Sequence, residues 1–172
     1  MVDDDPDFLF LANRAFKKLG VMSVIQTAGT GSEGIAYVMG EGKFADRKTY
    51  PYPTFIITDL KMPVSDGFAV LEHLKSNPAW AVIPVVVLTG SSDKDDIKKA
   101  YMLGASAFHV KPTDGASLQH QVKVLHDYWM TCEVPQVDST GRQLTTNSKG
   151  KLGERFDQPE GDRGGPARLE DQ

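Results

Sequence analysis

The sequence predicts an α/β fold in which a doubly wound, five-stranded parallel sheet is covered by helices on both faces. Helical and strand patterns alternate from about residue 6 to residue 133. The apolar runs at 55–57 and 83–88 are short, and the second is rich in β-branched residues, as in strands that are buried on both sides. Polar residues follow the strand-like runs. Alternation of this kind joins parallel strands through helices.

Five strands are expected, and the first is truncated. The other four are predicted at 24–28, 54–58, 83–89 and 106–110. Only Met1 and Val2 precede the first acidic residues, so the first strand has little apolar chain from which to form. A shortened strand forms fewer hydrogen bonds with its neighbours and buries less apolar surface. The free energy lost in this way is large relative to a total stability of about 5–15 kcal/mol.

Each expected helix has apolar residues at helical spacing or a recognisable start and stop. Gly20 ends the first, Thr30 or Ser32 caps the second, and residues 77–78 end the third. The fourth, at 92–104, has an acidic first turn that suits the helix dipole. The apolar positions are Phe8, Ala12, Ala15 and Leu19; Ile35, Val38 and Met39; Phe68, Leu71 and Leu74; and Leu118, Val122, Leu125 and Trp129.

Composition divides the chain into one domain, residues 1–133, and a disordered C-terminal tail, residues 134–172. The tail is rich in Gly, Pro, Ser, Thr and charged residues, and it shows no apolar period. The chain has a net charge of −4, no apolar run of membrane-spanning length and Cys132 as its single cysteine. These features favour a cytoplasmic protein without membrane insertion and without direct nucleic-acid binding.

Reactive side chains follow the predicted strands. Asp3 and Asp4 follow the first, Asp59 the third, Thr89 the fourth and Lys111 the fifth. In an open parallel sheet the working site lies beyond the carboxyl ends of the strands. We therefore expect three carboxylates, a hydroxyl and an amine to meet at one edge.

This set of groups suits phosphoryl transfer with Mg²⁺. Clustered carboxylates repel one another unless a cation neutralises them, and Mg²⁺ takes oxygen ligands together with substrate phosphate. A lysine provides a compact positive charge for a phosphoryl group. A remaining carboxylate can act as the nucleophile, as in enzymes that form an aspartyl phosphate.

Four motifs in order resemble the receiver domain of bacterial two-component response regulators. They are "VDDDPD", "IITDLKMPVSDG", "PVVVLTGSS" and "GASAFHVKP". The resemblance implies a CheY-like, flavodoxin-like sheet with strand order 2-1-3-4-5. The long segment 40–53 and the ending "LHDYWMTCEVP" also resemble regulators paired with phytochrome-type sensor kinases.

The resemblance implies a role for each site residue. Asp59 matches the phosphoacceptor. Asp4 matches the direct Mg²⁺ ligand and Asp3 a ligand that acts through water, and Lys61 is expected to offer its backbone carbonyl. The remaining implied roles are the switch residues Thr89 and Phe108, the phosphoryl-binding Lys111, and a cis peptide bond before Pro112.

The expected function is a single-domain response regulator in a phosphorelay. A sensor histidine kinase or histidine phosphotransfer protein phosphorylates Asp59, and a change of conformation then reaches an unknown downstream protein. The chain is not expected to be an enzyme beyond its own phosphorylation and autodephosphorylation, since position 61 is Lys rather than a second acid. An alternative is a pseudo-receiver that acts as a protein-interaction module without phosphate. In a simpler alternative, Asp3 to Asp5 are only an acidic cluster at the N-terminus of a helix, and Asp59 is only a turn residue.

Overall fold

The computed structural model describes residues 1–20, 25–63, 66–78 and 80–134. Three regular strands form a parallel sheet in the order β1-β2-β3: β1 Ile56–Thr58, β2 Val85–Thr89 and β3 Ala107–Val110. The helices are α1 Pro6–Lys18, α2 Gly31–Met39, α3 Gly67–Ser76, α4 Lys94–Met102 and α5 Gly115–Thr131, with a short 3-10 helix, η1, at Gly42–Phe44.

Two single-residue bridges extend the sheet beyond β1. Val2 pairs in parallel with Thr58 on one side and with Ala28 on the other. The Val2 N–H donates to the Ile57 carbonyl at 2.8 Å, and the Asp59 N–H donates to the Val2 carbonyl at 2.9 Å. With these bridges the order across the sheet is 2-1-3-4-5. The predicted fold class is confirmed, including the truncated first strand.

The predicted second strand is shorter than expected. Among its described residues, only Ala28 forms a bridge, and residues 21–24 lie outside the description. A strand needs a partner along its length, and the bridges of the first strand involve only Val2. The short first strand therefore limits its neighbour as well.

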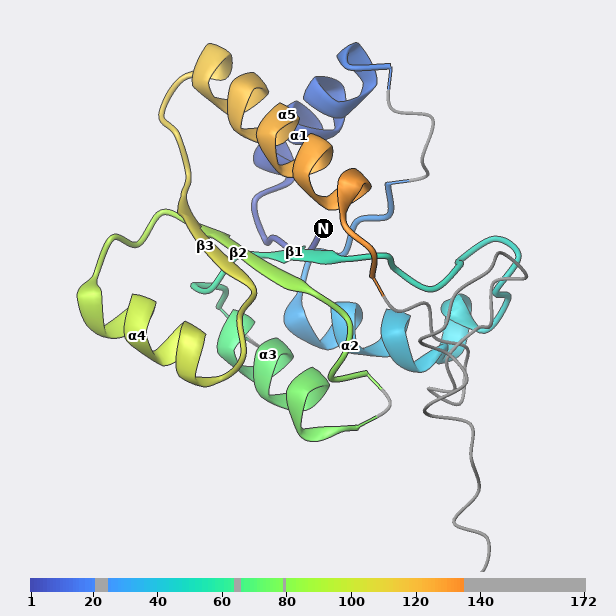
Figure 1. The fold of residues 1–172 in the computed structure, drawn as a ribbon. Helices are drawn as coiled ribbons and strands as arrows, with labels where there is room; N and C mark the ends of the chain where they lie inside the picture. Colours follow the sequence, from blue (N-terminus) through green and yellow to red (C-terminus); the bar gives the residue numbers. More distant parts are fainter. Residues whose placement is uncertain (21–24, 64–65, 79, 135–172) are drawn as a thin grey trace, which may run out of the picture.

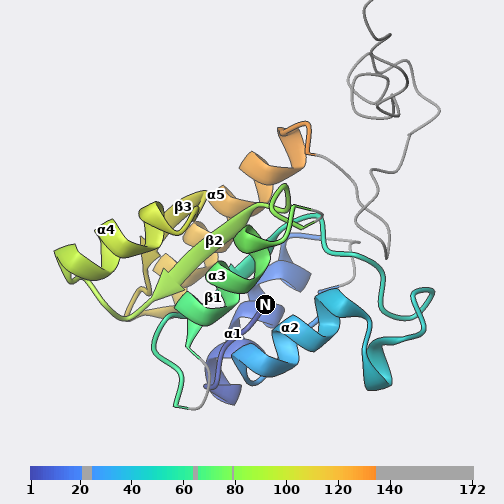
Figure 2. The same ribbon diagram turned by 90° about the horizontal axis from the view of Figure 1, so that it is seen from below.

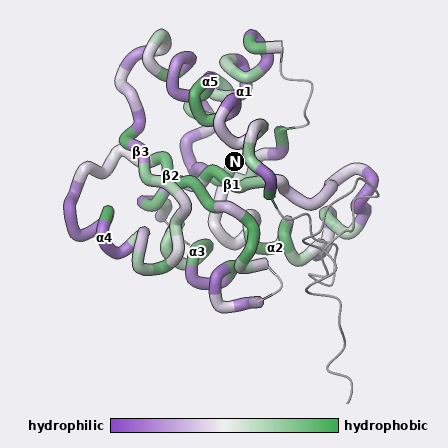
Figure 3. The backbone as a smooth tube through the Cα atoms, viewed as in Figure 1, coloured by the Kyte–Doolittle hydropathy of each residue, from purple (hydrophilic) through white to green (hydrophobic). Residues whose placement is uncertain are grey.

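Helices cover both faces of the sheet. Figure 1 shows α1 and α5 above the sheet and α2, α3 and α4 below it, and Figure 2 shows the same layers from below. Along β2 the side chains alternate between the layers: Val85 and Val87 belong to the core shared with α3, and Val86 and Leu88 to the core shared with α5. Figure 3 shows the apolar strands between helices whose outer sides are hydrophilic.

Side-chain caps fix where each α-helix begins. Asp5 accepts hydrogen bonds from the N–H groups of Asp7 and Phe8 at the start of α1. Four further N-caps are Thr30, Asp66, Asp93 and Asp114. Each cap satisfies N–H groups that have no partner within the helix. Three of the helices start directly after a loop that leaves the carboxyl edge of β1, β2 or β3, so the caps also determine the course of these loops.

No helix among the described residues is long and apolar enough to cross a membrane. Of the predicted tail, 134–172, only Val134 is described, and it packs against the core beside α5. The division into a domain and a disordered tail therefore stays a prediction.

Candidate functional site

Asp59 lies at the carboxyl end of β1 with its side chain nearly buried. The residue is 7% exposed. Its Oδ1 accepts hydrogen bonds from the N–H groups of Leu60 at 2.6 Å and Lys61 at 3.2 Å. These bonds hold the carboxylate against the loop that follows Asp59 and leave its Oδ2 atom for another partner.

The close approach of α3 holds this loop in place. The Gly67 N–H donates to the Leu60 carbonyl at 3.0 Å. A Cβ atom at position 67 would lie 1.9 Å from the carbonyl oxygen of Asp59. Only glycine fits here, which explains the residue at the start of the third helix.

Asp3 and Asp4 reach the same edge from the truncated first strand. Asp3 is 2% exposed and Asp4 is exposed. One carboxylate oxygen from each of Asp3, Asp4 and Asp59 lies within 4.8 Å of the others. Burial raises the pKa of Asp3 above its usual range, although the hydrogen bond with Lys111 acts in the opposite direction. We call these three residues the acidic cluster.

Lys111 is the counter-ion of the acidic cluster. Its Nζ lies 2.7 Å from Oδ2 of Asp3 and 2.7 Å from Oδ2 of Asp59, and its side chain is 16% exposed. Burial opposes the charged form, but the hydrogen bonds to both carboxylates outweigh it and raise the pKa of Lys111. The ring of Phe8 lies beneath the amine, 4.2 Å from Nζ to the ring centroid.

The acidic cluster suits a divalent cation. Three carboxylates share one positive side chain, so negative charge remains at the site, and their oxygens are the ligands that Mg²⁺ prefers. The close set of oxygen atoms agrees with the predicted ligands Asp3, Asp4 and Asp59. The predicted contribution of the Lys61 carbonyl stays a prediction.

The two predicted switch residues lie on the neighbouring strands. Thr89 ends β2 and is fully buried, and its carbonyl accepts the Lys111 N–H at 2.7 Å. Its Oγ1 accepts the Ser91 N–H at 3.4 Å. Phe108, in β3, is partly buried against the core on the side of α3 and α4. Thr89 therefore borders the site, and Phe108 lies in the layer next to it. The movement of these two residues on phosphorylation stays a prediction.

The predicted cis bond before Pro112 is wrong. No described residue follows a cis peptide bond, so the bond between Lys111 and Pro112 is trans. Proline only makes cis accessible, and trans is still favoured by about 0.5–1 kcal/mol. With the trans bond, Lys111 reaches both Asp3 and Asp59.

Two contacts at the site were not expected from the sequence. Phe8 appeared as a core position of the first helix, yet its ring contacts the Lys111 amine. Asp96 appeared only as part of an acidic first turn, yet it pairs with Lys61 at 3.0 Å and with Ser91 at 2.5 Å. The sequence signal for these contacts was the position of Asp96, a few residues after the "TGSS" segment.

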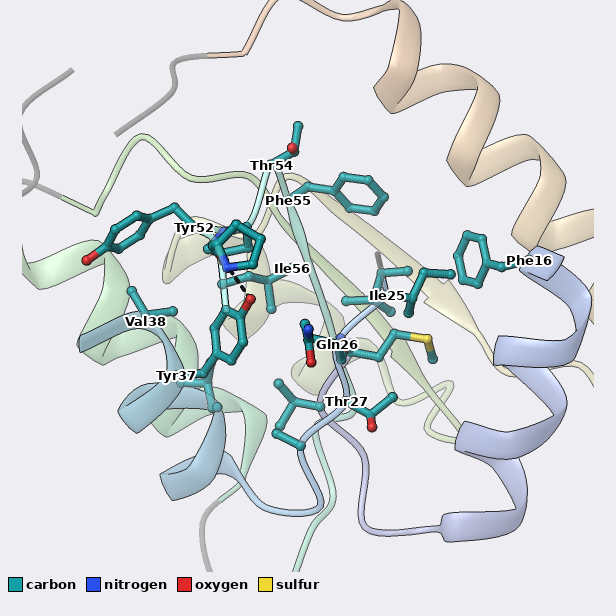
Figure 4. A pocket seen from close by; sticks show the side chains of 18 of the residues that line it. Phe16, Ile25, Gln26, Thr27, Tyr37, Val38, Tyr52, Thr54, Phe55 and Ile56 are labelled. Atoms are coloured by element: carbon teal, nitrogen blue, oxygen red, sulfur yellow. Dashed lines mark hydrogen bonds between the residues drawn. The ribbon is translucent and has the colours of Figure 1, made fainter. Parts of the chain in front are cut away.

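A cavity lies away from the acidic cluster. It has a volume of about 420 Å³ and lies beside the first strand, with Phe16 of α1, Tyr37 and Val38 of α2, and Ile25 and Phe55 among its lining residues. Figure 4 shows these side chains, together with the hydrogen bond from the Tyr37 hydroxyl to the Pro51 carbonyl. None of the acidic cluster lines it, so this cavity is separate from the acidic cluster.

Comparison with known proteins agrees with this geometry. The family model for the response regulator receiver domain matches residues 1–123. The probable methanogenesis regulatory protein FilR2 of Methanothrix harundinacea is 30% identical over 133 residues, which are 76% of this chain and 81% of FilR2.

Two response regulators are similar in structure or sequence. The phosphorylated cyanobacterial phytochrome response regulator RcpA is 32% identical, with a TM-score of 0.73, over 78% of this chain and 95% of RcpA. Rcp1 of Synechocystis is 32% identical over 58% of this chain and 66% of Rcp1. The Mn²⁺-bound form of Rcp1 has a TM-score of 0.64 at 29% identity, over 78% of this chain and 95% of that structure. These findings confirm the resemblance predicted from the sequence.

Proposed function

Since this chain belongs to the response regulator receiver family, we propose that it is a response regulator that accepts a phosphoryl group on Asp59. The donor is a histidine kinase or a histidine phosphotransfer protein. The observation that supports this most strongly is the position of the Lys111 amine, 2.7 Å from Asp59 and from Asp3 within the acidic cluster. A carboxylate, a fixed cation and further cation ligands are what transfer to an aspartate requires.

In the proposed reaction a carboxylate oxygen of Asp59 attacks the phosphorus of a phosphohistidine. The new P–O bond forms as the P–N bond breaks, and the electron pair of that bond stays on the histidine nitrogen of the donor. Asp59 is held for this attack by the N–H groups of Leu60 and Lys61. Transfer of this type depends on positioning and electrostatic stabilisation more than on covalent help from the protein.

The positive charges at the site have separate sources. Asp3, Asp4 and Asp59 would hold Mg²⁺, which when bound offsets the charge of the carboxylates and of the transferred group. Lys111 offers its ammonium to the phosphoryl oxygens after exchanging its present hydrogen bond with Asp59. The Mn²⁺-bound form of Rcp1 supports a cation at such a site.

The output is a change of surface near β3 and α4. The phosphoryl group attracts the Thr89 hydroxyl, which now accepts only the Ser91 N–H among the described contacts. Movement of Thr89 leaves space into which the half-buried Phe108 repacks. Such a local charge change biases a two-state element, and a protein partner reads the result. The partner, and the predicted cytoplasmic location, stay predictions.

The chain is proposed to act on no outside substrate. Position 61 is Lys, and its amine pairs with Asp96, so no second carboxylate follows Asp59 as an acid or base. The similarity to the phytochrome response regulator RcpA supports a phytochrome-type sensor kinase as the donor.

Phosphoryl transfer from acetyl phosphate and from a phosphorylated histidine donor tests the proposal. We expect the wild-type chain to take up label in the presence of Mg²⁺, and Asp59→Asn to take up none. Asp66→Asn is a matched control, because Asp66 caps α3 outside the acidic cluster. Equal labelling of Asp59→Asn and wild type would reject Asp59 as the site. Absence of label in every variant would favour the pseudo-receiver.

A further inference from the structure

The cavity beside the first strand joins the two cores of the molecule. Phe16 and Ile25, among its lining residues, pack in the core shared with α5. Val38 and Val70, on its other side, belong to the core shared with α3. Figure 4 shows Phe16 and Ile25 across the cavity from Val38. Met130 of α5 also lines the cavity and is 44% exposed, so one side is open to solvent. We call it the first-strand cavity.

The lining of the first-strand cavity is mainly apolar. No Asp, Glu, Lys or Arg is among its described lining residues. Two of the polar side chains already have partners: the Tyr37 hydroxyl donates to the Pro51 carbonyl at 2.5 Å, and the Gln26 amide donates to the Thr49 carbonyl at 3.3 Å. A charged or strongly polar ligand would lose its hydration without gaining partners, which is costly. The cavity therefore favours a neutral, apolar molecule.

One main-chain donor faces the first-strand cavity. N–H groups along a strand of a sheet point alternately to its two neighbours. The Ile56 N–H donates to the Pro84 carbonyl at 2.9 Å, on the side of β2, so the Ile57 N–H points toward the first strand. There the Met1 carbonyl accepts the Ala28 N–H at 2.8 Å, and the Ile57 N–H has no acceptor among the described residues. Ile57 lines the cavity and is 5% exposed, and a buried N–H without a partner is rare.

The volume indicates the size of an occupant. The cavity measures about 420 Å³, and ligand pockets usually measure about 300–1,000 Å³. An engineered apolar cavity of about 150 Å³ in another protein binds benzene, so a space roughly three times as large admits a molecule of two or three rings.

We propose that the first-strand cavity binds a neutral aromatic molecule of two or three rings that carries one carbonyl group. The rings lie among the apolar side chains of both cores, and the carbonyl accepts the Ile57 N–H. Val2 also lines the cavity, and its carbonyl accepts the Asp59 N–H at 2.9 Å. An occupant therefore packs against the strand ends that carry Asp3 and Asp59. The site does not depend on the proposed function.

The fluorescence of N-phenyl-1-naphthylamine, a neutral probe with three rings, tests the site in the full chain. We expect saturable binding with a dissociation constant of about 10–100 µM, as is reasonable for an apolar ligand of this size. Displacement by 2-acetylnaphthalene should need an about two- to ten-fold lower concentration than displacement by 2-isopropylnaphthalene, which has the same shape and no acceptor. Equal displacement by the two would overturn the role of the Ile57 N–H, and the absence of saturable binding would overturn the site.

Variants locate the bound probe. Val38→Phe fills part of the cavity and should weaken probe binding about tenfold or more, because protein interiors leave little room to adjust. Val82→Phe is the matched control, since it makes the same change at a 43% exposed position outside the lining. Met130→Glu places a charge at the open side without altering the core, so it should weaken binding even if Val38→Phe does not fold. Unchanged binding in either folded cavity variant, or an equal loss in Val82→Phe, would overturn the inference.

Discussion

Lys111 joins carboxylates from distant parts of the sequence. The side chains of Asp3 and Asp59 are 2% and 9% exposed, and each contacts the Lys111 amine. Taking away the amine would leave two buried carboxylates side by side. Removing one partner of a buried ion pair is costly, because the remaining charge is neither paired nor well solvated.

We expect Lys111→Met to lower the free energy of unfolding by roughly 3 kcal/mol in the absence of divalent cations. Mg²⁺ should restore part of this loss, because a bound cation replaces the missing positive charge. Urea unfolding with and without Mg²⁺ measures both effects. Lys123→Met is the control, because Lys123 pairs with Asp127 where both side chains are more than half exposed. An equal loss in the two variants would contradict the account.

Gly67→Ala should disturb the phosphoacceptor loop. The new Cβ atom would meet the carbonyl of Asp59 at 1.9 Å, and a backbone atom cannot rotate away as a side chain does. We expect a loss of about 1–3 kcal/mol of stability and weaker phosphorylation of Asp59. Gly115 also begins a helix, and a Cβ there would meet nothing within 4 Å. Thermal unfolding of both alanine variants should show a loss only for position 67.

His109 should make stability depend on pH. Burial lowers the pKa of His109 below 6.5. Below pH 6.5 the unfolded chain then binds more protons than the folded one, so stability falls as the pH falls through this window and rises as the pH rises. His109→Gln should flatten this part of the profile. Urea midpoints between about pH 5 and pH 8 measure it; equal slopes in wild type and His109→Gln would show that another group is responsible.

At the scale of elements, the connection between α2 and β1 depends on Arg47. Its Nη1 donates to the Tyr37 carbonyl and its Nη2 to the Val38 carbonyl, each at 2.7 Å. These carbonyls belong to the last turn of α2, where the Tyr37 carbonyl also accepts the Gly40 N–H at 3.2 Å and the carbonyls of a helix generally lack i+4 donors. The Arg47 guanidinium also lies 4.0 Å from the centroid of the Tyr52 ring.

Arg47→Lys should therefore be destabilising although it keeps the charge. A lysine cannot reproduce the planar fork that serves two carbonyls, and a hydrogen bond from a charged group is worth about 1.5–3 kcal/mol. We expect a loss of that order in chemical unfolding. Arg14→Lys, at an exposed position of α1, should have little effect, and a similar small effect at position 47 would exclude this role.

The elements themselves could largely be predicted from local signals. Asp93 caps α4 at the start of the range 92–104 in which the sequence predicted this helix. The strands at 83–89 and 106–110 are present in slightly shorter form. Of the expected strand at 24–28, the described residues 25–28 form only a bridge at Ala28, because the pairing depends on a distant segment and not on these residues alone.

At the scale of the molecule, the sequence predicted which residues would meet, because parallel strands bring their carboxyl ends to one edge. Asp3, Asp4, Asp59 and Lys111 do meet there. The isomer of the bond before Pro112 could not be predicted, since the two forms differ by so little energy. The contacts of Phe8 and Asp96 could not be predicted from the sequence either, because they depend on how helices pack against loops.

The central claim is that folding makes Asp59 the one carboxylate that carries a transferable phosphoryl group. Borohydride reduction of the phosphorylated chain, followed by peptide mass spectrometry, locates the acyl phosphate because the modified aspartate becomes homoserine. The account predicts homoserine at position 59, with Mg²⁺ present and not after chelation. Homoserine at another position, or equal conversion of Asp59 in the presence of a chelator, would contradict it.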